Sequence, residues 1–487
     1  MVCLTVYIVK RMTGMRWHSR SLNLSEIFLW IGGNNLKADK INTDRFSFEQ
    51  ILECKGRKAF NEHGYLMIRG IIRKDKEAEY SKTVQTQDRV QVTVTGADGE
   101  EINLFHGILY DVCFQYENGV VILKIHLKTA SYLADIKKHI RSFQEDNTEY
   151  AIIAGECLKT YRGGNYLIGK ITPTATGNFL MQYQETDWEF LKRLVSMSNS
   201  VLLADDETGD VKLYIGIPKF VCFHEIKSDC YKVCQKSNKT GNYEVYEVEE
   251  RELYKVGERI RFNNKDLMVC AVEMNLKGSE LVNTYYLISE SGISEERGYN
   301  KHLAGNSITG KITGIVRDQV MIDIDTDECS CSGKKKFPYA TIYSSPDGTG
   351  WYCMPEEGDK VRLYFPTENE ADAYVESSVH LQENTGLRDN PQEKSFMNRQ
   401  KKEILFTPDS LILRNNNGIS VELLDDYGIK IISDKSIMLK AETAIQINSS
   451  SGEIEMDAAK SVQMRQGSTQ LRIADKISMS GGKINLN

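Results

Sequence analysis

Four side chains near residue 230 are of the types that bind zinc. Cys222, His224, Cys230 and Cys234 lie close together in the sequence, and zinc prefers thiolate and imidazole ligands. The spacing of Cys230 and Cys234 falls within the usual range for a zinc pair, whereas Cys222 and His224 are closer together than usual. We therefore predict no metal site, and these four residues remain the candidates if one exists.

A second group of residues has the spacing of a calcium loop. Asp323, Asp325 and Asp327 occupy positions one, three and five of such a loop. Position six is Glu328 where the sharp turn needs glycine, and position twelve is Lys334 where calcium needs a bidentate glutamate. The pattern favours a solvated strand face that leads into a loop.

The residue patterns of common enzymes are missing from the sequence. It contains no Gly-x-Ser-x-Gly elbow and no glycine-rich loop followed by Lys-Ser or Lys-Thr. His63 stands beside Glu62 and could serve as a base, but we expect it to end a strand at a turn, held there by hydrogen bonds. We predict that the protein is not an enzyme and needs no cofactor.

Composition narrows the class of protein further. The chain has 487 residues, enough for about three domains. Its formal net charge of −7 argues against nucleic-acid binding, which normally leaves a basic footprint. Eleven dispersed cysteines indicate reduced thiols, and the sequence lacks both a membrane-length apolar segment and a signal peptide. We expect assembly in the cytosol.

Alternating apolar residues predict a mainly β protein. Residues 1–42 fit this pattern poorly and are expected to form an N-terminal extension, possibly disordered. In residues 43–300, Val90, Val92 and Val94 alternate with polar residues. Thr186 and Glu189 have the spacing of a capping box, which predicts one amphipathic helix near 186–199.

Two shorter segments follow. Residues 305–382 contain about five short alternating strands, which is typical of a small closed or partly closed barrel. Residues 383–403 are polar with few apolar anchors, so we expect a solvated linker.

The last segment, residues 404–487, repeats short apolar–polar–apolar triplets. They begin at positions 411, 429, 437, 445, 454, 462, 471, 477 and 484. A repeat this short cannot enclose a core in one turn, so it must stack on neighbours. Three chains winding together would bury the aliphatic residues along a common axis. We predict an intertwined trimeric β-helix, a prism on the order of 50 Å long.

Four segments resemble VgrG proteins and the central spikes of contractile phages. Residues 354–379 are similar to the spike's OB-fold, residues 61–70 and 184–205 to its hub domain, and the tail repeats to its β-helix. The resemblance implies hub β-barrel domains, an OB-fold at 305–382 and a homotrimeric spike of a contractile injection machine. Its implied partners are a hexameric inner tube, baseplate proteins, a PAAR-like tip protein, effector cargo and, transiently, a target membrane.

The sequence also departs from the family. It has no lysozyme domain between barrel and tail, and no effector domain follows the last repeat, which again argues against catalysis. The tip protein would dock on the last residues of the shaft, which are Gly481, Gly482, Lys483, Ile484, Asn485, Leu486 and Asn487. The spike would then be ejected to the outside or into a target cell.

Two other functions remain open. A trimeric tail fibre or adhesin would need an exposed aromatic cluster, and a peptidoglycan hydrolase would need a paired acid and base in a cleft. Type VI systems, extracellular particles, phage tails and bacteriocins all remain candidates for the machine itself.

Overall fold

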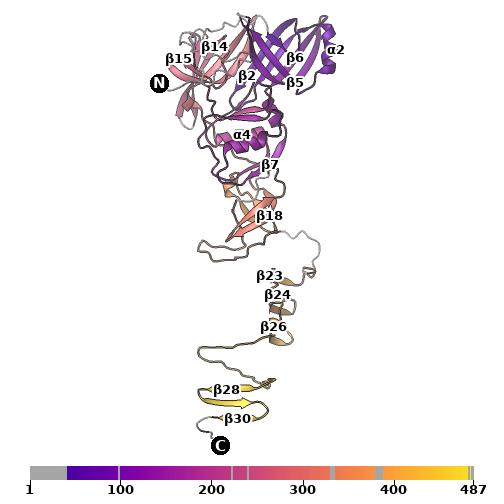
Figure 1. Ribbon diagram of the computed structural model, residues 1–487, viewed down its shortest axis with the longest axis vertical. Helices are drawn as coiled ribbons and strands as arrows, with labels where there is room; N and C mark the ends of the chain where they lie inside the picture. The colour runs from indigo at the N-terminus through magenta and orange to yellow at the C-terminus, as the bar shows by residue number, and fades with distance from the viewer. Residues whose placement is uncertain are drawn as a thin grey trace, which may run out of the picture. The chain divides into compact units, whose positions relative to one another are not determined.

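The computed structural model describes residues 41–96, 99–220, 223–238, 241–329, 335–378, 386, 388–480 and 483. The chain divides into two compact units, Met1–His380 and Leu381–Asn487, and each is mainly β (Figure 1). All but two residues of the predicted N-terminal extension, 1–42, lie outside the described residues. No helix in the described ranges is long and apolar enough to cross a membrane.

The first unit contains a large sheet, for which the described residues supply twelve strands. These are β1 (Ile41–Thr43), β2 (Gln50–Ala59), β3 (Tyr65–Ile72), β4 (Arg89–Thr95), β5 (Glu101–Glu117), β6 (Val120–Lys128), β12 (Phe223–Glu225), β13 (Tyr231–Asn238), β14 (Gly241–Glu250), β15 (Arg259–Phe262), β16 (Lys265–Lys277) and β17 (Glu280–Ile288). The order is β1-β4-β5-β6-β3-β2-β16-β17-β14-β13, and β15 joins β12 to β16. The β2–β16 pair therefore makes one sheet of the early and late strands, as the purple and salmon ribbons of Figure 1 show.

Alternation along the strands creates the core of this sheet. Val90, Val92 and Val94 of β4 are fully buried, as their spacing predicts. They pack in one large cluster with residues of the later strands, including Val248 and Leu287. Helix α2 (Lys74–Thr83) adds Tyr80 to the same cluster.

A second layer of short elements follows the first strands. It comprises the 3-10 helix η2 (Ala130–Asp135), β7 (Lys138–Phe143), α3 (Tyr150–Leu158), β8 (Asn165–Ile168), β9 (Leu180–Thr186), α4 (Asp187–Ser196), β10 (Leu202–Ala204) and β11 (Lys212–Ile215), and the short η3 (Glu290–Gly292) comes later. The predicted capping box is confirmed: Thr186 and Glu189 each bond the other's backbone amide. Helix α4 ends at Ser196, and it buries Trp188 and Leu191 against this layer.

The end of the first unit is a nearly closed five-stranded barrel. Its elements are β18 (Ser307–Val316), β19 (Gln319–Ile324), β20 (Phe337–Pro338), β21 (Lys360–Tyr364), η4 (Glu370–Asp372) and β22 (Tyr374–Glu376), in the strand order β20-β19-β18-β21-β22. A parallel bridge from Tyr339 to Val375 links the two end strands. Phe179 and Met181, which lie beside and in β9, enter the core of this barrel, so the barrel is packed onto the preceding layer.

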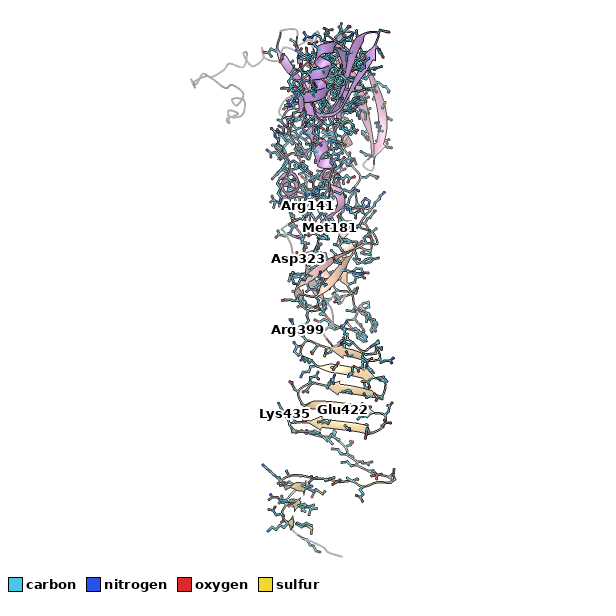
Figure 2. All side chains as sticks on the ribbon, turned by 90° about the vertical axis from the view of Figure 1, so that its right-hand side faces the viewer. Arg141, Met181, Asp323, Arg399, Glu422 and Lys435 are labelled. Atoms are coloured by element: carbon cyan, nitrogen blue, oxygen red, sulfur yellow. The ribbon has the colours of Figure 1, made fainter. Side chains whose placement is uncertain are left out.

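The second unit consists of two antiparallel meanders. The first contains β23 (Lys394–Met397), β24 (Glu403–Thr407), β25 (Ser410–Arg414), β26 (Ile419–Leu424) and β27 (Gly428–Ser433), and the second contains β28 (Val462–Gln466), β29 (Thr469–Ile473) and β30 (Ile477–Ser480). Figure 2 shows the stacked strands of the first meander near Glu422. Strand β23 falls within 383–403, where the sequence predicts a linker.

The structure also differs from the prediction between the two meanders. The triplets that begin at 437, 445 and 454 form no strand, although residues 434–461 are all described. A three-residue strand makes few hydrogen bonds, and a single chain places no partner strand beside these triplets. The other tail strands of a single chain form two open sheets, and the predicted β-helix prism is not present in the part of the chain that this structure describes.

Candidate functional site

The first meander has one almost wholly apolar face. Because side chains alternate along a strand and paired residues share a face, the registers of β23 to β27 define this face. Lys394 and Ser433 are its polar members, at its two ends. Its apolar members are Phe396, Ile404, Phe406, Leu411, Leu413, Ile419, Val421, Leu423, Ile429 and Ile431. We call these ten residues the upper apolar face.

The opposite face of the same meander is mixed and mostly polar. Arg414 Nε donates to Glu403 Oε2 at 2.7 Å across the β24–β25 pair. Ser420 Oγ donates to Glu422 Oε1 at 2.8 Å, and Lys430 lies opposite Glu422 on the next strand. These polar groups remain satisfied in contact with water. The same face also carries the apolar residues Met397, Leu405, Ile412, Leu424 and Ile432.

The second meander separates apolar from polar side chains on its two faces more sharply than the first meander does. One face carries Val462, Met464, Leu471, Ile473, Ile477 and Met479, which we call the lower apolar face, and the polar pair Gln466 and Thr469 lies at one end of it. Gln463, Arg465, Gln470, Arg472, Ser478 and Ser480 make up the other face. Such a division is typical of a sheet with one face in a dry core and one in water.

Neither apolar face is covered within one chain. Most of the upper apolar face is exposed, and on the lower face Met464, Ile477 and Met479 are exposed too. Ile437, Leu439, Ile445 and Ile447 of the strandless segment are also exposed. Each aliphatic side chain is worth about 1.5–3 kcal/mol when buried, and exposed apolar patches this extensive mark interaction sites. The arrangement can therefore bind another apolar surface.

Three of the four zinc candidates, His224, Cys230 and Cys234, are described, and they form no cluster that could hold a metal ion. Cys222 lies outside the described residues. His224 is in β12, with its Nε2 3.7 Å from Glu258 Oε2, while Cys230 is exposed and Cys234 is half-buried in β13. Across the described part of the chain, no three His, Cys, Asp or Glu side chains are arranged to hold a metal ion.

Two aspartates of the calcium-like pattern, Asp325 and Asp327, interact with other parts of the protein. Asp327 Oδ1 accepts hydrogen bonds from the backbone amides of Ser142 at 3.0 Å and Cys329 at 2.8 Å. Asp325 lies 3.4 Å from Lys360 Nζ across the barrel surface. As for the predicted tip-docking residues, Lys483 is exposed. Gly481, Gly482 and residues 484–487 fall outside the described residues.

His63 is held by hydrogen bonds in a turn, as predicted. Its Nδ1 lies 2.8 Å from Ser131 Oγ and its Nε2 3.2 Å from Asp135 Oδ2, an arrangement like that of a catalytic triad. However, Ser131 is only 1% exposed and is also bonded to Thr129. A nucleophile must reach its substrate, so these residues stabilise the turn. Burial lowers the pKa of His63.

A network of buried charges around α4 was not predicted. Arg193 makes two 2.8 Å bonds to the carboxylate of Glu185 and one of 2.6 Å to Glu370 of the barrel. Burial opposes ionisation of Arg193, but Glu370 and Glu185 outweigh it and raise the pKa of the guanidinium. The network joins the barrel to the layer before it.

A second buried group lies at the N-terminus of α4. Arg141 pairs with Asp187, which is fully buried and also accepts a 2.7 Å bond from Tyr161 Oη. Burial, followed by the hydrogen bond to Asp187, raises the pKa of Tyr161. The sequence predicts only the apolar stripe of α4. No local pattern predicts these charged pairs, because the partners lie far apart along the chain.

Comparison with known proteins identifies the fold. No protein-family model matches the chain, and no curated protein matches it significantly in sequence. The E. coli c3393 protein, a type VI secretion system component described as structurally similar to the T4 tail proteins gp27 and gp5, matches with a TM-score of 0.50 at 13% identity, over 70% of this chain and 100% of that one.

The Francisella PdpA–VgrG complex provides further matches, each with a TM-score of 0.52 at 11% identity. In the lidless form the match covers 78% of this chain and 93% of the other. In the half-lidded form it covers 80% and 87%. The resemblance to VgrG that the sequence motifs predict is thus confirmed at the level of the fold.

Proposed function

We propose that this protein is the hub and spike of a contractile injection machine. In this proposal the first unit joins the inner tube and baseplate, and residues 394–480 of three copies form the shaft. The OB-fold and hub assignments made from the sequence belong to the same proposal. The shared fold with VgrG and with a relative of T4 tail proteins supports it.

The upper and lower apolar faces carry the proposal. Each inner strand of a meander already has ladder partners on both sides in its own chain, so what a single chain lacks is a cover for its apolar side chains. Three sheets that turn these faces inward would enclose a dry core and leave the polar faces in water. The aliphatic triplets between residues 434 and 461 would then gain strand partners from neighbouring chains.

The work of such a rod is mechanical. A prism with a packed core has no free long edge and resists bending, so it can transmit force along its axis. In this proposal sheath contraction supplies the energy for puncturing a target membrane, and the spike needs no catalytic step. The protein would assemble in the cytosol and leave the cell as part of the particle.

Further partners follow from this role. A hexameric tube protein and baseplate proteins would bind the hub, and a PAAR-like tip protein would dock on residues 481–487. Francisella VgrG occurs in a complex with PdpA, which supports a bound cargo here as well. Removing residues 481–487 should abolish tip binding in a pull-down, and unchanged binding would contradict the docking assignment.

The mass of the full chain in solution tests the central claim. Size-exclusion chromatography with light scattering should give three times the mass of one chain, down to low micromolar concentration. Electron microscopy of the same sample should show a rod at one end. A well-folded monomer at these concentrations would rule out the proposed spike.

A further inference from the structure

An apolar hairpin projects from the barrel between β20 and β21. We call residues 341–353 the aromatic arm. Ser344 and Gly350 form an isolated antiparallel bridge. Trp351 donates its backbone N–H to Tyr343 O at 2.8 Å, and Ser345 does the same to Thr349 O. These bonds define a two-stranded ribbon, in which Tyr343 lies opposite Trp351 and Ile342 lies opposite Tyr352.

The aromatic arm carries large exposed apolar or aromatic side chains on both of its sides. Because side chains alternate along each strand, Tyr343 and Trp351 share one side, and Ile342 and Tyr352 share the other. Ile342 is 89% exposed and Tyr352 74% exposed, while Trp351 and Tyr343 are more than half exposed. Asp347 at the tip is the one charged residue in the arm.

The aromatic arm is nevertheless held in a defined shape. Tyr352 Oη donates a 3.0 Å hydrogen bond to Arg317 O in the β18–β19 turn. At the tip, Asp347 Oδ1 accepts bonds from both the amide and the hydroxyl of Thr349. Gly350 has a φ of 139°, and a Cβ there would lie 2.4 Å from Tyr343 O. A two-stranded ribbon is marginal in water by itself, so an ordered apolar ribbon is preorganised for a partner.

We propose that the aromatic arm packs between neighbouring copies of this chain in the trimer. A ribbon with two apolar sides needs two covering surfaces, and a ring of three copies gives every arm a neighbour on each side. The near absence of charge favours an apolar protein surface over an anionic partner. This inference rests on the proposed function, because it requires three copies around one axis.

The chain links each arm to the proposed shaft. Strand β22 of the barrel ends at Glu376, and β23, the first strand of the upper apolar face, begins at Lys394. Three copies joined through their apolar faces would therefore carry three barrels, each connected to the shaft by residues 377–393. Contacts between the arms and the neighbouring barrels would fix the barrels against rotation about the axis.

Hydroxyl-radical footprinting of the full chain tests this directly. Trp351 and Tyr352 should be oxidised at least about fivefold more slowly in the trimer than in Leu471→Asp, which is designed to be monomeric through a charge on the lower apolar face. The matched variant Gln470→Asp places the same charge on the polar face of the same strand and should keep the protection.

The possible outcomes separate the arm from the trimer. A trimeric mass with Trp351 and Tyr352 as reactive as in the monomer overturns the arm contact and leaves the spike standing. A monomeric wild-type chain overturns both. Protection that appears only after soluble peptidoglycan fragments are added would assign the arm to glycan binding and overturn the contact between copies.

Two variants of the aromatic arm provide a second readout. Tyr352→Ser should raise the concentration at which the trimer dissociates by about tenfold, as the loss of one interface anchor does. Cys353 is exposed at the base of the arm, so a short bis-maleimide should link Cys353 of one chain to a neighbouring chain in the trimer, and Cys353→Ser should remove that link. An unchanged dissociation concentration together with no link would overturn the inference.

Discussion

The two units of this protein bury apolar side chains in opposite ways. In residues 41–378 the sheet, the second layer and the barrel enclose four clusters of buried side chains. Between residues 388 and 480, all of them described, Leu405 is the one buried apolar side chain. Both units use alternating strands, so alternation alone does not create a core. A core also needs a second surface, and the tail has none within one chain.

The difference has a physical origin in the length of the repeat. The strands of the first unit reach 17 residues in β5 and can bend into closed or layered arrangements. The tail strands have four to six residues, and each presents one to three apolar side chains to one side. The first unit therefore has a core within one chain, whereas in the proposed trimer the stability of the tail would depend on assembly.

The largest expected effect comes from a charge on an apolar face of the tail. Leu471→Asp would place a carboxylate in the dry core of the trimer, where an unpaired charge costs several kcal/mol per copy. Light scattering should show that this variant is a monomer. Its near-ultraviolet circular dichroism, which reports on the first unit, should stay unchanged.

The matched control for this prediction is Gln470→Asp. Gln470 lies on the polar face beside Arg465, so its replacement should leave the trimer intact. If both variants have the same oligomeric state, the two faces do not differ in their role in assembly. The proposed difference between the two units would then be wrong.

A smaller effect is expected from the buried charges of the first unit. Arg193→Met leaves Glu185 and Glu370 buried without their cation, which typically costs about 3–5 kcal/mol. Urea unfolding of the first unit should show this loss at every protein concentration, because the network lies within one chain.

Arg261→Met is the comparison for Arg193→Met. Arg261 makes an exposed pair with Asp266 at 3.0 Å, and such pairs contribute about 0–1 kcal/mol. If the two variants lose equal amounts of unfolding free energy, burial of Arg193 does not increase its contribution to stability. A loss that depends on concentration would show that the first unit, too, is stabilised by assembly.

The smallest effect concerns pH and His63. Burial lowers the pKa of His63 below its ordinary value of 6.5, so the unfolded chain takes up a proton that the folded chain does not. The contribution of His63 to stability is therefore present above pH 6.5 and is lost as the pH falls.

A variant separates this contribution from the other groups that titrate. His63→Gln should make the fall in unfolding free energy between pH 7 and pH 5 smaller than in the unaltered protein. Replacement of the exposed His302 by Gln should leave the slope unchanged. A slope that is unaltered in His63→Gln would contradict the burial effect.

The sequence by itself determined the periodic features of this protein. The alternation at Val90, Val92 and Val94, the capping box at Thr186 and Glu189, and the one-sided apolar pattern of β28 to β30 are all legible from residue spacing. The reason is that backbone geometry sets these periods locally, within a few residues.

Only the tertiary structure decided which distant groups meet. Arg193 and Glu370 are 177 residues apart in the chain, and their 2.6 Å bond has no local signature. The defined shape of the aromatic arm depends on a hydrogen bond to Arg317, which lies in another turn. The triplets between 434 and 461 form no strand, because strand pairing needs a neighbouring strand in space. Spacing along a chain fixes which side a residue faces, whereas packing in three dimensions fixes what covers it.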